Sequence, residues 1–102
     1  MFLYRFGPNI NPLPFISLLK DNVFKEIMLY RRLLVDDLLK KYTKEDIENI
    51  IDKGLCIVGN SIWMITSGQE GQFLRAIEYG TGNSKAYHII TNALRKTLKE
   101  VL

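Results

Sequence analysis

The sequence predicts an α+β fold, in which a small antiparallel sheet packs on two long amphipathic helices accompanied by short ones. The stretch Val23–Tyr42 has neither Gly nor Pro and repeats its apolar residues with a helical period. Two short apolar segments, Leu55–Val58 and Ser61–Thr66, flank Gly59-Asn60, a pair typical of a two-residue hairpin turn. A length of 102 residues is that of one domain, so we expect these elements to share one core.

Composition places the chain among ordinary globular proteins, because 47% of its residues are apolar and 25% are charged. The net charge of +3 is mild, and its excess lies near the C-terminus. Cys56 has no second cysteine to pair with, and we expect it to be buried. The sequence holds no membrane-length apolar run, and Arg5, Gly7 and Pro8 interrupt any signal-peptide-like segment. We therefore expect an intracellular location and no membrane partner.

The N-terminal elements follow from alternation and turn residues. Phe2–Phe6 places an aromatic residue at every second position, which predicts a strand with one buried face formed by Phe2, Tyr4 and Phe6. Gly7–Pro12 turns the chain, and Pro14 begins a short helix that ends at Lys20. Asp21 and Asn22 break that helix, and Asn22 is expected to cap the long helix that follows.

The long helix Val23–Tyr42 is amphipathic. Its apolar arc comprises Val23, Phe24, Ile27, Met28, Leu34, Val35, Leu38, Leu39 and Tyr42, and its polar side carries Lys25, Glu26, Arg32, Asp36, Asp37, Lys40 and Lys41. Three residues break this pattern. Leu29 and Leu33 lie on the polar side, where they are either scattered surface residues or a second contact face. Arg31 lies in the apolar arc. Near the core edge it either reaches solvent or makes a salt bridge, or else it lines a groove and binds a carboxylate or phosphate.

The next segments continue the sheet. Thr43 and Asp46 approach a capping box, so Lys44–Asp52 is predicted to be a helix, with Gly54 as its C-terminal stop. Ser61–Thr66 is apolar on both faces, which predicts the central strand of the sheet. A turn at Ser67–Gly71 is then expected.

The C-terminal segments are predicted to be helical. A short helix is expected over Gln72–Tyr79, and Ser84 is expected to cap a last helix, Lys85–Leu102. The loop Gly80–Lys85 is a connector or, at most, a loose phosphate-binding turn at a helix start. The last helix carries a polar and mostly basic stripe: Lys85, His88, Asn92, Arg95, Lys96 and Lys99. This stripe is either the solvated side of the helix or a contact for phosphate or an acidic partner.

The order strand, turn, short helix, long helix occurs twice, over residues 1–42 and 61–102, with a connector at 43–60. Pro14–Asn22 (PFISLLKDN) aligns with Gln72–Gly80 (QFLRAIEYG), which pairs Phe15 with Phe73. A structural repeat would give two pseudo-symmetric halves with a groove between them. Neither half of about 50 residues would bury enough surface to fold alone.

No catalytic, cofactor or metal site is predicted. His88 is the sole histidine and has no nearby acid or nucleophile in the sequence. A metal site needs at least three suitable ligands. Asp36-Asp37 and Glu45-Asp46 are most simply solvated charge. We therefore expect a protein that is not an enzyme and holds no cofactor.

Two resemblances add to this interpretation. Leu38–Ile77 resembles archaeal winged-helix DNA-binding domains, through Thr43, Gly54-Leu55, Thr66 and Phe73-Leu74 around a two-stranded wing, LCIVGNSIWMIT. Taken whole, from MFLYRFGPNINPLPF to LRKTLKEVL, the chain resembles small orphan proteins of the filamentous viruses of hyperthermophilic archaea. Such proteins have no assigned activity, so this resemblance implies a viral origin, with a place in the host cytoplasm, and no site residues.

The leading hypothesis is a non-enzymatic protein–protein interaction module. Leu29, Arg31 and Leu33 are its candidate contact residues, and a protein, a peptide or a second copy of the chain is its candidate partner. The alternative is nucleic-acid binding. It would use the wing and the basic stripe, because Glu45, Asp46, Glu48 and Asp52 give the Lys44–Asp52 helix the wrong charge for a phosphate backbone.

Overall fold

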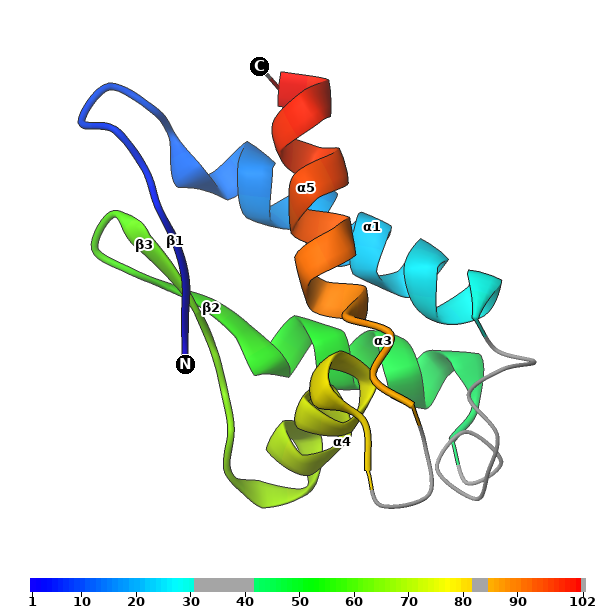
Figure 1. The fold of residues 1–102 in the computed structure, drawn as a ribbon. Coiled ribbons are helices and arrows are strands. Elements are labelled where there is room, and N and C mark those ends of the chain that lie inside the picture. The colour runs from blue at the N-terminus through cyan, green and yellow to red at the C-terminus, as the bar shows by residue number, and fades with distance from the viewer. Residues whose placement is uncertain (31–41, 82–84, 102) are drawn as a thin grey trace.

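The predicted α+β fold is confirmed by a computed structural model that describes residues 1–30, 42–81 and 85–101 (Figure 1). Along the chain lie β1 (Phe2–Arg5), α1 (Pro12–Leu29), α3 (Lys44–Gly54), β2 (Leu55–Val58), β3 (Ser61–Met64), α4 (Gly68–Tyr79) and α5 (Ile89–Val101). The sheet lies at one side of the molecule, and the described helices gather on the other side (Figure 1).

The sheet has three antiparallel strands in the order β1-β3-β2. The central position of β3 confirms the prediction made for this segment, although the strand ends at Met64 and not at Thr66. The hairpin between β2 and β3 turns at Gly59, whose φ of 64° is in the left-handed region that favours glycine. The β2 strand has the predicted bounds.

The first strand departs from its predicted pattern at a bulge. The β1–β3 register shifts between Phe2 and Tyr4, so these two residues do not share a face as regular alternation would require. Tyr4 and the buried Phe6 turn toward the helices, where their rings lie 5.7 and 4.9 Å from the ring of Phe15 on α1. Phe2 stays 46% exposed. The prediction that Phe2 belongs to the buried face is therefore wrong.

Helix α1 is longer at its start than predicted and has no break in its middle. Asn11 caps it, and the helix runs without interruption through Asp21 and Asn22. Asn22 is buried, and its amide donates to Thr97 Oγ1 of α5 at 2.9 Å. Because a tertiary hydrogen bond satisfies the Asn22 side chain, it does not cap a new helix as predicted. The helix ends at Leu29, and residues 31–41 of the predicted long helix lie outside the described residues.

The predicted capping box at the start of α3 is confirmed. Thr43 Oγ1 accepts from the Asp46 N–H at 3.1 Å, and Asp46 Oδ2 accepts from the Thr43 N–H at 3.0 Å. The helix continues two residues beyond its predicted end, so Gly54 is inside it. A Cβ atom at Gly54 would lie 2.2 Å from Leu74 Cδ1. The glycine therefore lets α4 pack closely on α3.

The boundaries of the last two helices also differ from the prediction. Helix α4 begins at Gly68, inside the expected turn, whereas α5 begins at Ile89 and not at Lys85. The start of α5 follows from His88, whose backbone is left-handed with φ 52°. Ser84, the predicted cap, lies outside the described residues.

The core lies between the inner face of the sheet and the helices. It is built mainly from branched aliphatic residues, among them Leu19, Val23, Ile27, Ile47, Ile62, Leu74, Ile77, Ile89 and Ile90. Helix α5 lies across α1, and among the described elements these two pack together most extensively (Figure 1). None of the described helices has a stretch long and apolar enough to cross a membrane.

The internal repeat stays a prediction. The structure places a strand before helices in both segments, but α1 is continuous at Asn22 where the second segment breaks at Gly80. Most of the predicted long-helix pairing falls on residues 31–41, outside the described part of the chain.

Candidate functional site

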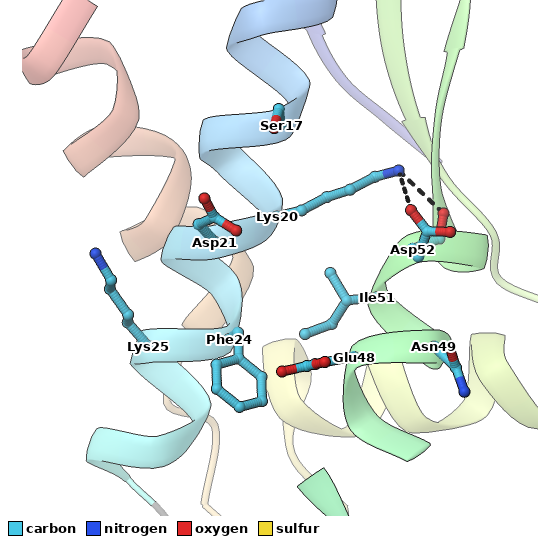
Figure 2. A pocket seen from close by; sticks show the side chains of 9 residues that line it. All are labelled: Ser17, Lys20, Asp21, Phe24, Lys25, Glu48, Asn49, Ile51 and Asp52. Carbon is cyan, nitrogen blue, oxygen red and sulfur yellow. Dashed lines mark hydrogen bonds and ion pairs between the residues drawn. The ribbon is translucent and has the colours of Figure 1, made fainter. Parts of the chain in front are cut away.

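An open groove lies between α1 and α3, with a volume of about 520 Å³ (Figure 2). It is lined by Ser17, Lys20, Asp21, Phe24 and Lys25 of α1 and by Glu48, Asn49, Ile51 and Asp52 of α3. Its accessible apolar surface comes from Phe24, which is partly buried, because Ile51 beneath it belongs to the core and is only 2% exposed. Figure 2 shows the Glu48 carboxylate directed across the groove toward the Phe24 ring.

One end of the groove is closed by an ion pair. Lys20 Nζ donates to Asp52 Oδ1 at 2.9 Å and to the Asp52 carbonyl oxygen at 3.1 Å, which links α1 to the end of α3. This pair neutralises two of the five charged residues along the groove. Among the described residues, Asp21, Lys25 and Glu48 make no ion pair. The groove therefore keeps a net negative charge beside an apolar surface.

The structure describes only one of the three predicted contact residues. Leu29 is 68% exposed in the last turn of α1, and it does not line the groove. Arg31 and Leu33 lie outside the described residues. The groove itself lies between α1 and α3, whereas α1 and α5 are packed together directly.

The structure divides the predicted basic stripe. Lys85 and His88 precede α5, so the prediction that they share its helical face is wrong. The Asn92 amide donates to the Tyr87 carbonyl oxygen at 3.1 Å, within its own segment. Arg95 and Lys99 are exposed and have no ion pair with any described residue.

Lys96, the remaining residue of the stripe, pairs with Glu26 of α1. The sequence placed Glu26 on the polar side of its helix, but the structure buries it to 2% exposure, and its carboxylate accepts a hydrogen bond from Lys96 Nζ. That hydrogen bond raises the pKa of Lys96 above its ordinary 10.5, against the opposing effect of desolvation. Lys96 thus holds α5 on α1, and its charge is matched within the protein.

His88 has an acidic neighbour that its local sequence does not indicate. Its Nδ1 lies 3.6 Å from Glu78 Oε2. Glu78 is buried, accepts from the Thr91 N–H at 3.0 Å and accepts from the Thr91 hydroxyl at 2.6 Å. These bonds satisfy the first turn of α5, so the cluster of Glu78, His88 and Thr91 fixes how α5 follows α4.

No family model, curated protein or solved structure matches this chain. Within residues 1–30, 42–81 and 85–101, no three His, Cys, Asp or Glu side chains are grouped so that they could hold a metal ion.

Sequence reasoning did not identify the groove. The sequence places Phe24 in the apolar arc of its helix, and it indicates Glu48 and Asp52 only as acidic residues that oppose phosphate binding. No local pattern links α1 to α3, because Lys20 and Asp52 are 32 residues apart and come together only when the two helices pack.

Proposed function

We propose that this protein is a non-enzymatic interaction module that binds an apolar, basic peptide segment of a partner protein in the α1–α3 groove. The proposal is supported by one observation above all: the partly exposed ring of Phe24 lies in the groove beside the carboxylates of Asp21 and Glu48, which no described cation pairs. Grooves between helices that bind amphipathic segments combine these two features.

The residues that line the groove indicate which side chains the partner segment should carry. An aliphatic or aromatic side chain of the segment would contact Phe24, and a Lys or Arg side chain would pair with Glu48 or Asp21. Lys25 on the same rim would repel a segment that is basic along its whole length. We therefore expect the ligand to be an amphipathic segment that carries its basic residues on one side only.

A peptide-library selection on the immobilised protein tests this proposal. We expect enriched peptides that combine apolar and basic residues, and we expect them to shift the amide NMR signals of α1 and α3. Glu48→Lys should weaken the binding of these peptides roughly tenfold, because it replaces an attractive contact at the groove with a repulsive one.

Glu45→Lys is the matched control, because it makes the same charge change on an exposed position of α3 that does not line the groove. It should leave the affinity nearly unchanged. Peptides that shift signals away from the two helices, or that lose equal affinity in both variants, would contradict the proposal.

Nucleic-acid binding is the alternative function, and one arrangement favours it. Helix α3 passes directly into the β2–β3 hairpin, as the winged-helix resemblance implies, and Lys85, Arg95 and Lys99 are exposed. Duplex DNA binding through α5 predicts that Arg95→Ala with Lys99→Ala lowers affinity for all sequences and reduces the salt dependence. An unchanged affinity of this double variant in fluorescence anisotropy would exclude the α5 surface.

A further inference from the structure

The outer face of the sheet, which points away from the core, carries an aromatic row. Phe2 of β1 and Cys56 of β2 are the register partners of Trp63, so a single row crosses all three strands. The rings of Phe2 and Trp63 meet edge to face, with their centres 5.6 Å apart. Phe2 is 46% and Trp63 is 39% exposed, so both rings remain open to a ligand. Exposed Val58 and Ile65 extend the apolar surface around this row.

The charge of this face is cationic. Arg5 is the sole charged residue of β1, β2 and β3, and its guanidinium carbon lies 6.0 Å from the centre of the Phe2 ring. The strands of the sheet and the turns beside them, residues 1–11 and 55–67, contain no Asp or Glu. A second copy of the chain, packed face to face, would offer no carboxylate to Arg5, whereas a phosphate would pair with it.

We propose that this sheet face binds single-stranded nucleic acid, with bases stacked on Trp63 and Phe2 and a phosphate bound by Arg5. Exposed aromatic residues on an antiparallel sheet stack with unpaired bases, and each such contact tolerates any base. A duplex keeps its bases stacked inside and cannot use the row. This surface is separate from the α1–α3 groove and from the cations of α5, so it does not depend on the proposed peptide function.

The intrinsic fluorescence of Trp63 is a direct probe, because it is the only tryptophan of the chain. The protein, tagged at its C-terminus so that β1 stays unmodified, is titrated with oligothymidylate and oligouridylate of about ten nucleotides. We expect both to quench Trp63, and we expect a duplex of equal length to quench it far less. The absence of quenching by either strand at low salt would overturn the proposal.

Variants then locate the binding surface by anisotropy of a labelled oligothymidylate. Trp63→Leu and Phe2→Leu keep an apolar residue in the strand, and each should weaken binding roughly tenfold. Arg5→Gln should weaken binding and reduce the slope of log affinity against log salt concentration by about 0.7. Circular dichroism checks that each variant is folded. If Trp63→Leu unfolds, the other two variants and the quenching of Trp63 decide the outcome.

Two control variants separate this proposal from the others. Arg95→Gln with Lys99→Gln removes two cations outside the sheet, and Glu48→Lys alters the groove. Neither variant should lower the affinity for oligothymidylate as Trp63→Leu does. Nucleic-acid binding that is lost in the α5 variant and retained in Trp63→Leu would overturn the proposal. A dimer that Trp63→Leu converts to a monomer would also overturn it, because a second copy would then cover the face.

Discussion

Two buried polar side chains of α1 fix where α5 lies on it. Asn22 and Glu26 are one helical turn apart, and their partners on α5 are the adjacent residues Thr97 and Lys96. Apolar packing between two helices tolerates small shifts, whereas a shift of one turn here would leave a buried amide and a buried carboxylate without partners. These two contacts therefore specify the register of α1 against α5 as well as contributing to stability.

The Asn22–Thr97 hydrogen bond predicts a non-additive pair of substitutions. Thr97→Val leaves the buried Asn22 amide without its acceptor and should lower the free energy of unfolding by about 1–3 kcal/mol. Asn22→Leu keeps the number and branching of the side-chain heavy atoms and removes the amide that lacks a partner. The double variant should therefore be more stable than Thr97→Val alone. Urea unfolding of the four proteins measures the coupling, and additive effects would contradict this account.

The Glu26–Lys96 pair predicts a loss of stability in alkali. Because its pKa is raised in the folded protein, Lys96 keeps its proton above pH 10.5, where the unfolded chain loses it. The unfolded state then binds fewer protons, so the free energy of unfolding falls as pH rises through this window. Glu26→Gln removes the charge that raises the pKa, and the wild type should lose more stability than this variant between pH 9 and 11.5. Equal pH dependence in the two proteins would show that the pair is not formed.

At the scale of elements, the sequence predicted correctly those helix boundaries that contacts between nearby residues stabilise. The Thr43–Asp46 capping box joins residues only three positions apart, and the start of α3 was predicted correctly from it. The break assigned at Asn22 was wrong because its partner is 75 residues away. Likewise, the first turn of α5 is bonded through Thr91 to Glu78 on the preceding helix, a contact that no local pattern indicates. Strand positions were predicted well, but nothing in the alternation of β1 indicated its bulge.

Helix α4 contains a glycine at which two effects oppose each other. Alanine at Gly71 should favour the helix by about 1 kcal/mol. However, its Cβ would lie 2.4 Å from the backbone carbonyl carbon of Thr66, which must then move. Overpacking of this kind costs about 1–3 kcal/mol, so Gly71→Ala should destabilise the protein by roughly 1 kcal/mol net.

Gly7→Ala is the control for this substitution, because a Cβ at Gly7 would meet no atom within 4 Å. Its effect on the free energy of unfolding should stay within about 0.5 kcal/mol. If thermal denaturation shows Gly71→Ala to be the more stable of the two variants, the close approach of α4 to Thr66 is not present in solution.

At the scale of the whole molecule, the two ends of the chain are interleaved. Strand β1 pairs with β3, and α1 packs on α5, so the N-terminal segment contacts elements from the second half of the sequence in both the sheet and the helices. The sequence predicted most of the elements, since these follow from periodicity and turn residues, and it placed Phe6, Val23 and Ile27 on buried faces. It could not predict the α1–α3 groove, because Phe24 and Glu48 become neighbours only through helix packing.

This interleaving predicts that the sheet and the helices unfold in one step. Trp63 fluorescence reports on the sheet, and far-ultraviolet circular dichroism reports mainly on the helices, so the two urea transitions should coincide. Ile62→Val, in the buried centre of the sheet, should lower both midpoints together, by about 0.5–1.5 kcal/mol in unfolding free energy. If Trp63 changes first while the helical signal persists, the sheet is a separately unfolding unit. The docking of β1 on β3 would then contribute little to holding α1 against α5.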